Sequence, residues 1–154
     1  MAKDLRPLGD PGSRSFQVDR YPFYQLNRLV SRYNSVIEAE LRRIRLDIPT
    51  WRVLMILGEQ EPRPIGQIAK LAVINISTLM RIVERMHKAD LIKSAASATD
   101  GRITELSLTA KGRTALATAR KVTAPIYQRL IRGFSATDFS HLLDLLNRLY
   151  GNLE

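Results

Sequence analysis

Residues 64–109 read PIGQIAKLAVINISTLMRIVERMHKADLIKSAASATDGRITELSLT, and the pattern of this stretch decides the fold. Its first apolar residues share one face of a short helix: Ile65, Ile68, Ala69 and Ala72. A second stripe recurs at the i, i+3, i+4 and i+7 spacing of a longer helix: Leu79, Ile82, Val83 and Met86. Asn75 or Ser77 can accept hydrogen bonds from the free backbone N–H groups that open this second helix. We therefore expect two helices joined by a short connection.

A β-hairpin is predicted directly after the second helix. Leu91 and Ile92 begin one short strand, and residues 103–108 alternate as a second strand. Asp100 and Gly101 lie between them and mark a hairpin tip, because both residues tolerate positive φ. Helix, connection, helix and ribbon is the order of a winged helix-turn-helix. The expected fold is mainly α with a small two-stranded β-wing.

Polar side chains of the second helix lie mostly away from its apolar stripe. Small hydrogen-bonding groups at a helix start, with arginines beyond them, form the type of surface that enters a DNA major groove. The candidate DNA-binding residues are Asn75, Ser77, Thr78, Arg81, Arg85, Lys88 and, at the hairpin tip, Arg102.

These basic candidates have different expected roles. A guanidinium can grip guanine in bidentate fashion, so Arg81 is the candidate for base readout. Arg85 and Lys88 lie further along the helix and are expected to hold phosphate. For Arg85 an ion pair within the helix, for example with Asp90, is an equally open alternative. Arg102 is expected to reach a narrow, A·T-rich minor groove, and Asp100 is either a plain turn residue or orients the wing.

The composition narrows the function classes. Lysine and arginine total 24 against 15 acidic residues, so the net charge is +9, which favours a polyanionic partner. Cysteine is absent, which excludes disulfides, thiolate metal sites and thiol redox sensing. The two histidines, His87 and His141, lack the spacing of a zinc site. The sequence has no run of about 18 apolar residues and no signal-peptide core, so we expect a cytoplasmic protein without a membrane partner.

Catalytic motifs are missing as well. The chain has no Gly-rich phosphate loop, no GxSxG motif and no cysteine nucleophile. Most acidic residues lie beside basic ones, as in ordinary surface pairing. We therefore expect neither an enzyme nor a cofactor or metal.

The flanking segments suggest how the chain is organised. Residues 1–19 are rich in Pro and Gly, carry Lys3, Arg6 and Arg14, and are expected to form a flexible arm, either a solvated tail or a basic arm that touches DNA or a partner subunit. Residues 48–109 are expected to form the DNA-binding domain. Residues 20–47 and 110–154 are expected to form a helical dimerisation region, because both contain long apolar stripes that one small lobe cannot cover.

The last helix shows this problem most clearly. A seam at period 3.5 runs along it: Phe139, Leu142, Leu146, Leu149 and Leu153. A helix this apolar would expose a large patch if it were left alone. We therefore expect the two ends of the chain to pack together and onto a second copy.

The chain resembles the MarR-type transcriptional regulators from about residue 21 to its C-terminus. The matching fragments are 51–54, 68–69, 77–78, 81–86, 91–92, 100–102 and 108–112. The chain departs from the family pattern at Pro64, at Met80, where Thr is common, and at residues 93–96 of the wing. The resemblance implies a two-fold homodimer built from the N- and C-terminal helices. Its two helix-turn-helix units would face successive major grooves of double-stranded DNA, about 10 base pairs apart.

The resemblance also implies a ligand cleft between the dimer helices and the DNA-binding lobe. Small aromatic acids or related metabolites, including thioesters, bind there in similar proteins. The candidate ligand-binding residues are Tyr24, Arg28, Trp51 and Tyr127. As an alternative, these four are core or interface residues.

The expected function is thus a dimeric, ligand-responsive repressor of a palindromic operator. Two alternatives remain open at this point: a winged-helix module that binds acidic protein partners, and a non-specific DNA binder without an effector. Activation in place of repression is also open.

Overall fold

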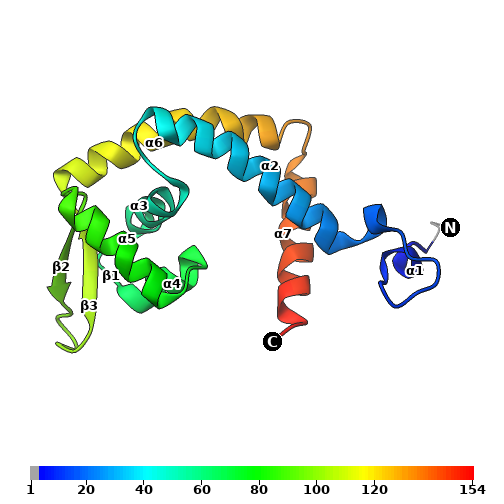
Figure 1. Ribbon diagram of the computed structural model, residues 1–154, viewed down its shortest axis with the longest axis horizontal. Helices are drawn as coiled ribbons and strands as arrows, with labels where there is room; N and C mark the ends of the chain where they lie inside the picture. Colours follow the sequence, from blue (N-terminus) through cyan, green and yellow to red (C-terminus); the bar gives the residue numbers. More distant parts are fainter. Residues whose placement is uncertain (1–3) are drawn as a thin grey trace.

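A computed structural model describes residues 4–154, so Lys3 of the predicted arm lies outside the described residues. Figure 1 shows a compact lobe at one end, two long helices arching over it, and a last helix that points away from the arch. The lobe contains α3 (Ile48–Glu59), α4 (Ile65–Ala72), α5 (Ile76–Lys88), β1 (Arg63–Pro64), β2 (Ile92–Ala96) and β3 (Thr104–Leu108). The remaining elements are α1 (Arg6–Gly9), η1 (Val18–Arg20), α2 (Pro22–Arg43), α6 (Ala110–Leu130) and α7 (Ala136–Gly151).

The helices begin where the sequence supplies capping side chains. The Asn75 side chain accepts from the backbone N–H of Thr78 at 2.8 Å, so Asn75, and not Ser77, caps α5. Thr109 caps α6 through Gly112 N at 2.9 Å. Ser135 and Asp138 form the capping box that opens α7. Asp47 caps α3 through Thr50 N at 2.8 Å.

The helix-turn-helix is formed by α4 and α5, which are bent by 108° across their connection. The turn uses Val73, whose φ of 54° and ψ of 48° lie in the left-handed region. No single helix within residues 4–154 is long and apolar enough to cross a membrane; α4 and α5 pass that test only together, across this bend.

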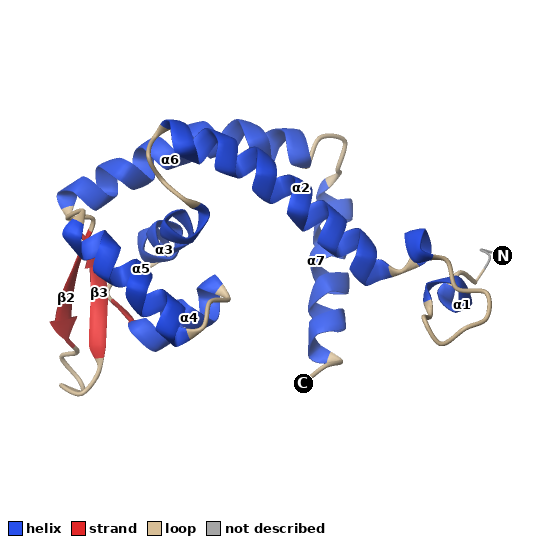
Figure 2. Cartoon of the chain, viewed as in Figure 1, coloured by secondary structure: helices blue, strands red, loops and turns tan. Residues whose placement is uncertain are grey.

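The sheet has three antiparallel strands in the order β1-β3-β2, so the prediction of a two-stranded wing was incomplete. Figure 2 shows the sheet at the end of the molecule opposite the N-terminal segment. Arg63 pairs with Leu106, and Ile92 pairs with Leu108. The segment between α3, which ends at Glu59, and α4 contributes Arg63 and Pro64 to the sheet as β1.

Two hydrophobic clusters hold the chain together. The larger fills the lobe between α3, α4, α5 and the sheet. It contains the predicted second-helix stripe, whose four residues are all buried, as expected. Each fully buried leucine of this kind contributes about 1.5–3 kcal/mol. The smaller cluster joins α2 to α6 through Ile37, Leu41, Ala119 and Ile126.

The two ends of the chain differ from the lobe. The predicted arm contains α1 and η1, and Gln17 N donates to Leu8 O at 2.9 Å. No residue of α7 is buried, and its leucine seam lies exposed. Figure 1 shows α7 descending from the arch, between the lobe and the N-terminal segment.

Candidate nucleic-acid interface

The polar candidates on α5 are all exposed. Asn75 Oδ1 accepts from both Thr78 N and the Ser77 hydroxyl, at 2.8 and 2.9 Å. The side-chain oxygen of Asn75 is therefore used to build the start of α5. Ser77 and Arg81 lie one helical turn apart on the outward face, opposite the buried stripe.

Arg81 and Lys88 form no ion pair with any carboxylate of residues 4–154. Helical spacing places both on the outward face with Ser77. This face presents two free cations and a hydroxyl, a combination that fits phosphate oxygens and base edges.

Arg85 has a partner outside its own helix. Its Nη2 donates to Asp47 Oδ2 at 2.8 Å, and Asp47 also caps α3. The pair therefore joins the second half of α5 to the junction between α2 and α3, and the alternative partner Asp90 is not the one used. Burial works against ionisation, yet hydrogen bonds from Thr50 and the charge of Arg85 together hold the pKa of Asp47 below its ordinary value of 3.8.

The wing tip differs in detail from the expected tight hairpin. Residues 97–103 join β2 to β3, and Ser97 N donates to Ile103 O at 2.8 Å. Neither Asp100 nor Gly101 has a positive φ, so the stated reason for the turn was wrong although its place was right. The Asp100 side chain accepts from Arg102 N at 3.0 Å, which holds the backbone of the exposed Arg102.

A bond from α5 to the wing was not foreseen from the sequence. His87 Nε2 lies 2.6 Å from Ser94 Oγ, so α5 contacts β2 directly. The two residues belong to no sequence motif, and they meet only because the sheet places β2 against α5. They fix the wing relative to α5.

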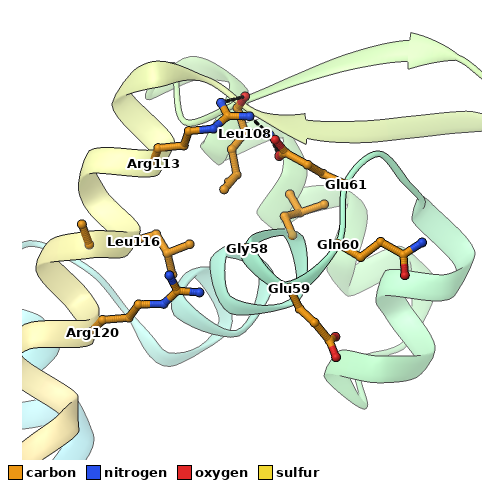
Figure 3. Close-up of a pocket in the computed structure, with 10 residues that line it drawn as sticks. Gly58, Glu59, Gln60, Glu61, Leu108, Arg113, Leu116 and Arg120 are labelled. Carbon is orange, nitrogen blue, oxygen red and sulfur yellow. Dashed lines mark hydrogen bonds and ion pairs between the residues drawn. The ribbon is translucent and has the colours of Figure 1, made fainter.

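A second connection holds the base of the wing. Glu61 accepts from Leu108 N at 2.7 Å, pairs with the Arg113 guanidinium, and Arg113 also donates to Leu108 O at 2.8 Å. Figure 3 shows this cluster at the rim of a pocket of about 320 Å³ between the end of α3 and α6. Glu61 forms an ion pair with Arg113, and Glu59 forms one with Arg63. The two carboxylates of this pocket therefore hold neighbouring segments of the chain together.

The four ligand candidates lie in different places. Tyr24 and Arg28 are exposed on the first half of α2, Tyr127 is exposed on α6, and Trp51 packs against the α2–α6 cluster. At a rise of about 1.5 Å per residue, Arg28 lies about 14 Å along the α2 axis from Ile37 of that cluster. Tyr24 and Arg28 are thus not among the residues that form or pack against the cluster that Trp51 joins.

Other residues line the space between α2 and α6. Two adjoining pockets of about 360 and 490 Å³ share Val36, Ile126 and Arg129. Arg32 and Tyr33 line the first of them, and Glu40 and Arg132 line the second. Their floor is apolar and their rim is mainly cationic.

Polar atoms without partners lie near the same junction. Trp51 Nε1 and Asn34 Oδ1 are buried and have no hydrogen-bond partner among residues 4–154. Burial raises the pKa of Tyr33, against the pull of the Arg52 charge. Tyr33, Asn34 and Arg52 were not among the ligand candidates from the sequence, because a polar residue between two apolar helices stands out only once those helices are packed.

Comparisons with known proteins agree with this geometry. Residues 46–104 match the profile of the MarR family. The chain is similar to the HTH-type transcriptional repressor IacR of Pseudomonas putida, with 36% identity over 145 residues, 94% of this chain and 87% of that protein.

Two solved structures share the fold. CouR from Rhodococcus jostii bound to p-coumaroyl-CoA matches with a TM-score of 0.80 at 18% identity, over 86% of this chain and 94% of that one. The transcriptional repressor CouR bound to a 23-mer DNA duplex matches with a TM-score of 0.75 at 22% identity, over 97% and 99% of the two chains.

Proposed function

This chain belongs to the MarR family of transcriptional regulators, and we propose from that premise that it is a homodimeric repressor which binds a palindromic operator and is released by a small aromatic ligand. The observation that carries the proposal is the outward face of α5, where Ser77, Arg81 and Lys88 lie exposed beside the wing. The similarity to a repressor over nearly the whole chain supports the same conclusion.

In this proposal α5 enters the major groove. Arg81 reads a guanine, Ser77 and Thr78 contact base edges or phosphate, and Lys88 holds phosphate. Arg102 reaches the minor groove from the wing, which Asp100, His87 and Glu61 hold in place. Arg85, which already donates to Asp47, contacts phosphate either in addition to that bond or in exchange for it. Asn75 acts mainly through the helix cap.

Two exposed apolar surfaces of the single chain support the proposed dimer. The leucine seam of α7 is exposed, and the α2–α6 groove offers an apolar floor with Arg32, Arg129 and Arg132 at its rim. The helix that carries the seam, α7, also carries Asp138 and Asp144. These negative charges complement the positive charges at the rim of the groove. We propose that α7 and α2 of two copies cover each other and set the distance between the two α5 helices.

The effector site is proposed at the α2–α3–α6 junction. The relative that holds p-coumaroyl-CoA shows that the shared fold accommodates an aromatic thioester. Trp51 Nε1 and Asn34 Oδ1 offer an unused donor and acceptor, and the charge of Arg52 lies close enough to oppose the rise in the Tyr33 pKa that burial causes. Tyr24, Arg28 and Tyr127 contribute only if the second copy brings them near. A ligand regulates here if it prefers one spacing of the two α5 helices by about 1–3 kcal/mol.

Selection of bound duplexes from a random pool tests this function. We expect a palindrome to be enriched and its affinity to fall steeply with salt concentration. In the same assay Arg102→Ala is expected to weaken binding by about 1–3 kcal/mol, and Arg81→Ala is expected to blur sequence preference more than Lys88→Ala does.

Other outcomes separate the alternatives. Salt-dependent binding without an enriched sequence would identify a non-specific DNA binder. Absence of duplex binding would leave a protein-interaction module.

A further inference from the structure

An apolar row runs beside the polar row on the exposed face of α5. Ile76 and Met80 are 52% and 41% exposed and lie one helical turn apart. Ser77 and Arg81 each follow them by one residue, so the two rows lie side by side, about 100° apart around the helix axis. Neither Ile76 nor Met80 is among the buried residues that form the hydrophobic cluster of the lobe.

The turn before α5 carries a third exposed apolar residue. Val73 is 86% exposed, although its φ of 54° is an uncommon conformation for a β-branched side chain. The residue gains no burial that would offset the strained backbone. Glu84 lies one turn beyond Met80, so the apolar surface is confined to the turn and the first half of α5.

We infer that Ile76 and Met80, together with Val73 of the turn, recognise the 5-methyl groups of thymines next to the base pair that Arg81 reads. Thymine is the base that places a methyl group in the major groove, where apolar side chains contact it. The inference rests on the proposed function, because it concerns how the same helix reads duplex DNA.

Charge complementarity identifies DNA as the occupant of this surface. The neighbouring row carries Arg81 and Lys88, which lack carboxylate partners in the described chain, and the whole chain carries a net charge of +9. A second copy of the same chain would bring these cations against each other. A duplex supplies phosphates for the cations and methyl groups for the apolar row at once.

Deoxyuridine provides a direct test, since it removes the methyl group and leaves the hydrogen-bonding edge of thymine intact. Two duplexes of the selected operator are compared with the unmodified protein, one with thymine and one with deoxyuridine at each half-site thymine. Loss of each contacted methyl group should weaken binding about fourfold, as expected for burial of one methyl group. Deoxyuridine placed outside the half-sites should have no effect.

Variants locate the contact. Ile76→Ser and Met80→Ser should each lower the ratio of thymine to deoxyuridine affinities toward one. Leu71→Ser is the matched control, because Leu71 is 50% exposed on α4 outside the row, and it should keep the ratio of the unmodified protein.

The failures are distinguishable. Equal affinity for the two duplexes overturns the inference and leaves the proposed function standing, whereas no preference for the operator over random duplex removes the proposed function itself. An unchanged ratio in both variants also overturns the inference. A change in self-association at an unchanged ratio would assign the row to a protein interface and overturn it too.

Discussion

At the scale of a single residue, Asp47 links the start of α3 to α5 through two separate bonds. One oxygen caps α3 at Thr50 N and the other accepts from Arg85 of α5. Asp47→Ala loses both bonds and is expected to lower the free energy of unfolding by about 1–2 kcal/mol. Asp47→Asn keeps a capping oxygen and loses the charge, so the loss should be smaller, about 0.5 kcal/mol. Urea unfolding measures both, and equal losses would show that the cap contributes nothing.

The pH dependence of the same variants separates the charge from the cap. Because the pKa of folded Asp47 is lowered, its stabilisation is fully present above the ordinary value of 3.8 and is lost as the pH falls through the folded pKa. The difference between the unmodified protein and Asp47→Asn should therefore be present at neutral pH and vanish in acid. A difference that persists unchanged below the folded pKa would contradict an electrostatic origin.

At the scale of an element, α6 depends on a close approach at Gly112. A Cβ built there would lie 2.0 Å from Leu91 O, the carbonyl that also accepts from Thr109 N. Gly112→Ala must push α6 away from the base of the wing, and we expect a loss of about 1–3 kcal/mol in unfolding free energy. Gly66→Ala is the matched control: its Cβ would meet nothing within 4 Å inside α4, so we expect a gain of about 0.5–1 kcal/mol. Destabilisation of both variants alike in urea would contradict the close-approach argument.

At the scale of the whole molecule, the exposed seam of α7 predicts assembly. Leu146 lies within the seam, and Asn147 lies next to it on the polar side of the helix. Leu146→Lys is expected to give a monomer at micromolar concentration that no longer prefers a palindrome, because a charge in an apolar contact remains unpaired. Asn147→Lys adds the same charge and should stay dimeric. Sedimentation velocity distinguishes them, and a monomeric unmodified protein would refute the dimer.

Much of the fold could be predicted because its signals are local. The stripe of Leu79, Ile82, Val83 and Met86 follows from helical spacing alone, and its burial is confirmed. The capping residues Thr109 and Ser135 accept from backbone N–H groups three residues away, so they too can be recognised from the sequence alone. The exposed polar row of α5 is the complement of the stripe. The DNA-binding roles of its residues remain predictions.

Long-range contacts were decided by the tertiary structure. Arg63 belongs to the sheet because it pairs with Leu106, which lies far away in the sequence. Arg85 donates to Asp47 although Asp90 is nearer in the chain. Tyr24 and Arg28 lie nearer the start of α2 than the residues of α2 that pack in the same cluster as Trp51, and the sequence pattern alone did not distinguish the two groups. The sequence by itself determined which faces are apolar, where the helices start and which cations stay outside, because these depend on neighbours within one helical turn. The tertiary structure decided which polar groups meet, since charge and hydrogen bonding act through space between residues that the chain order keeps apart.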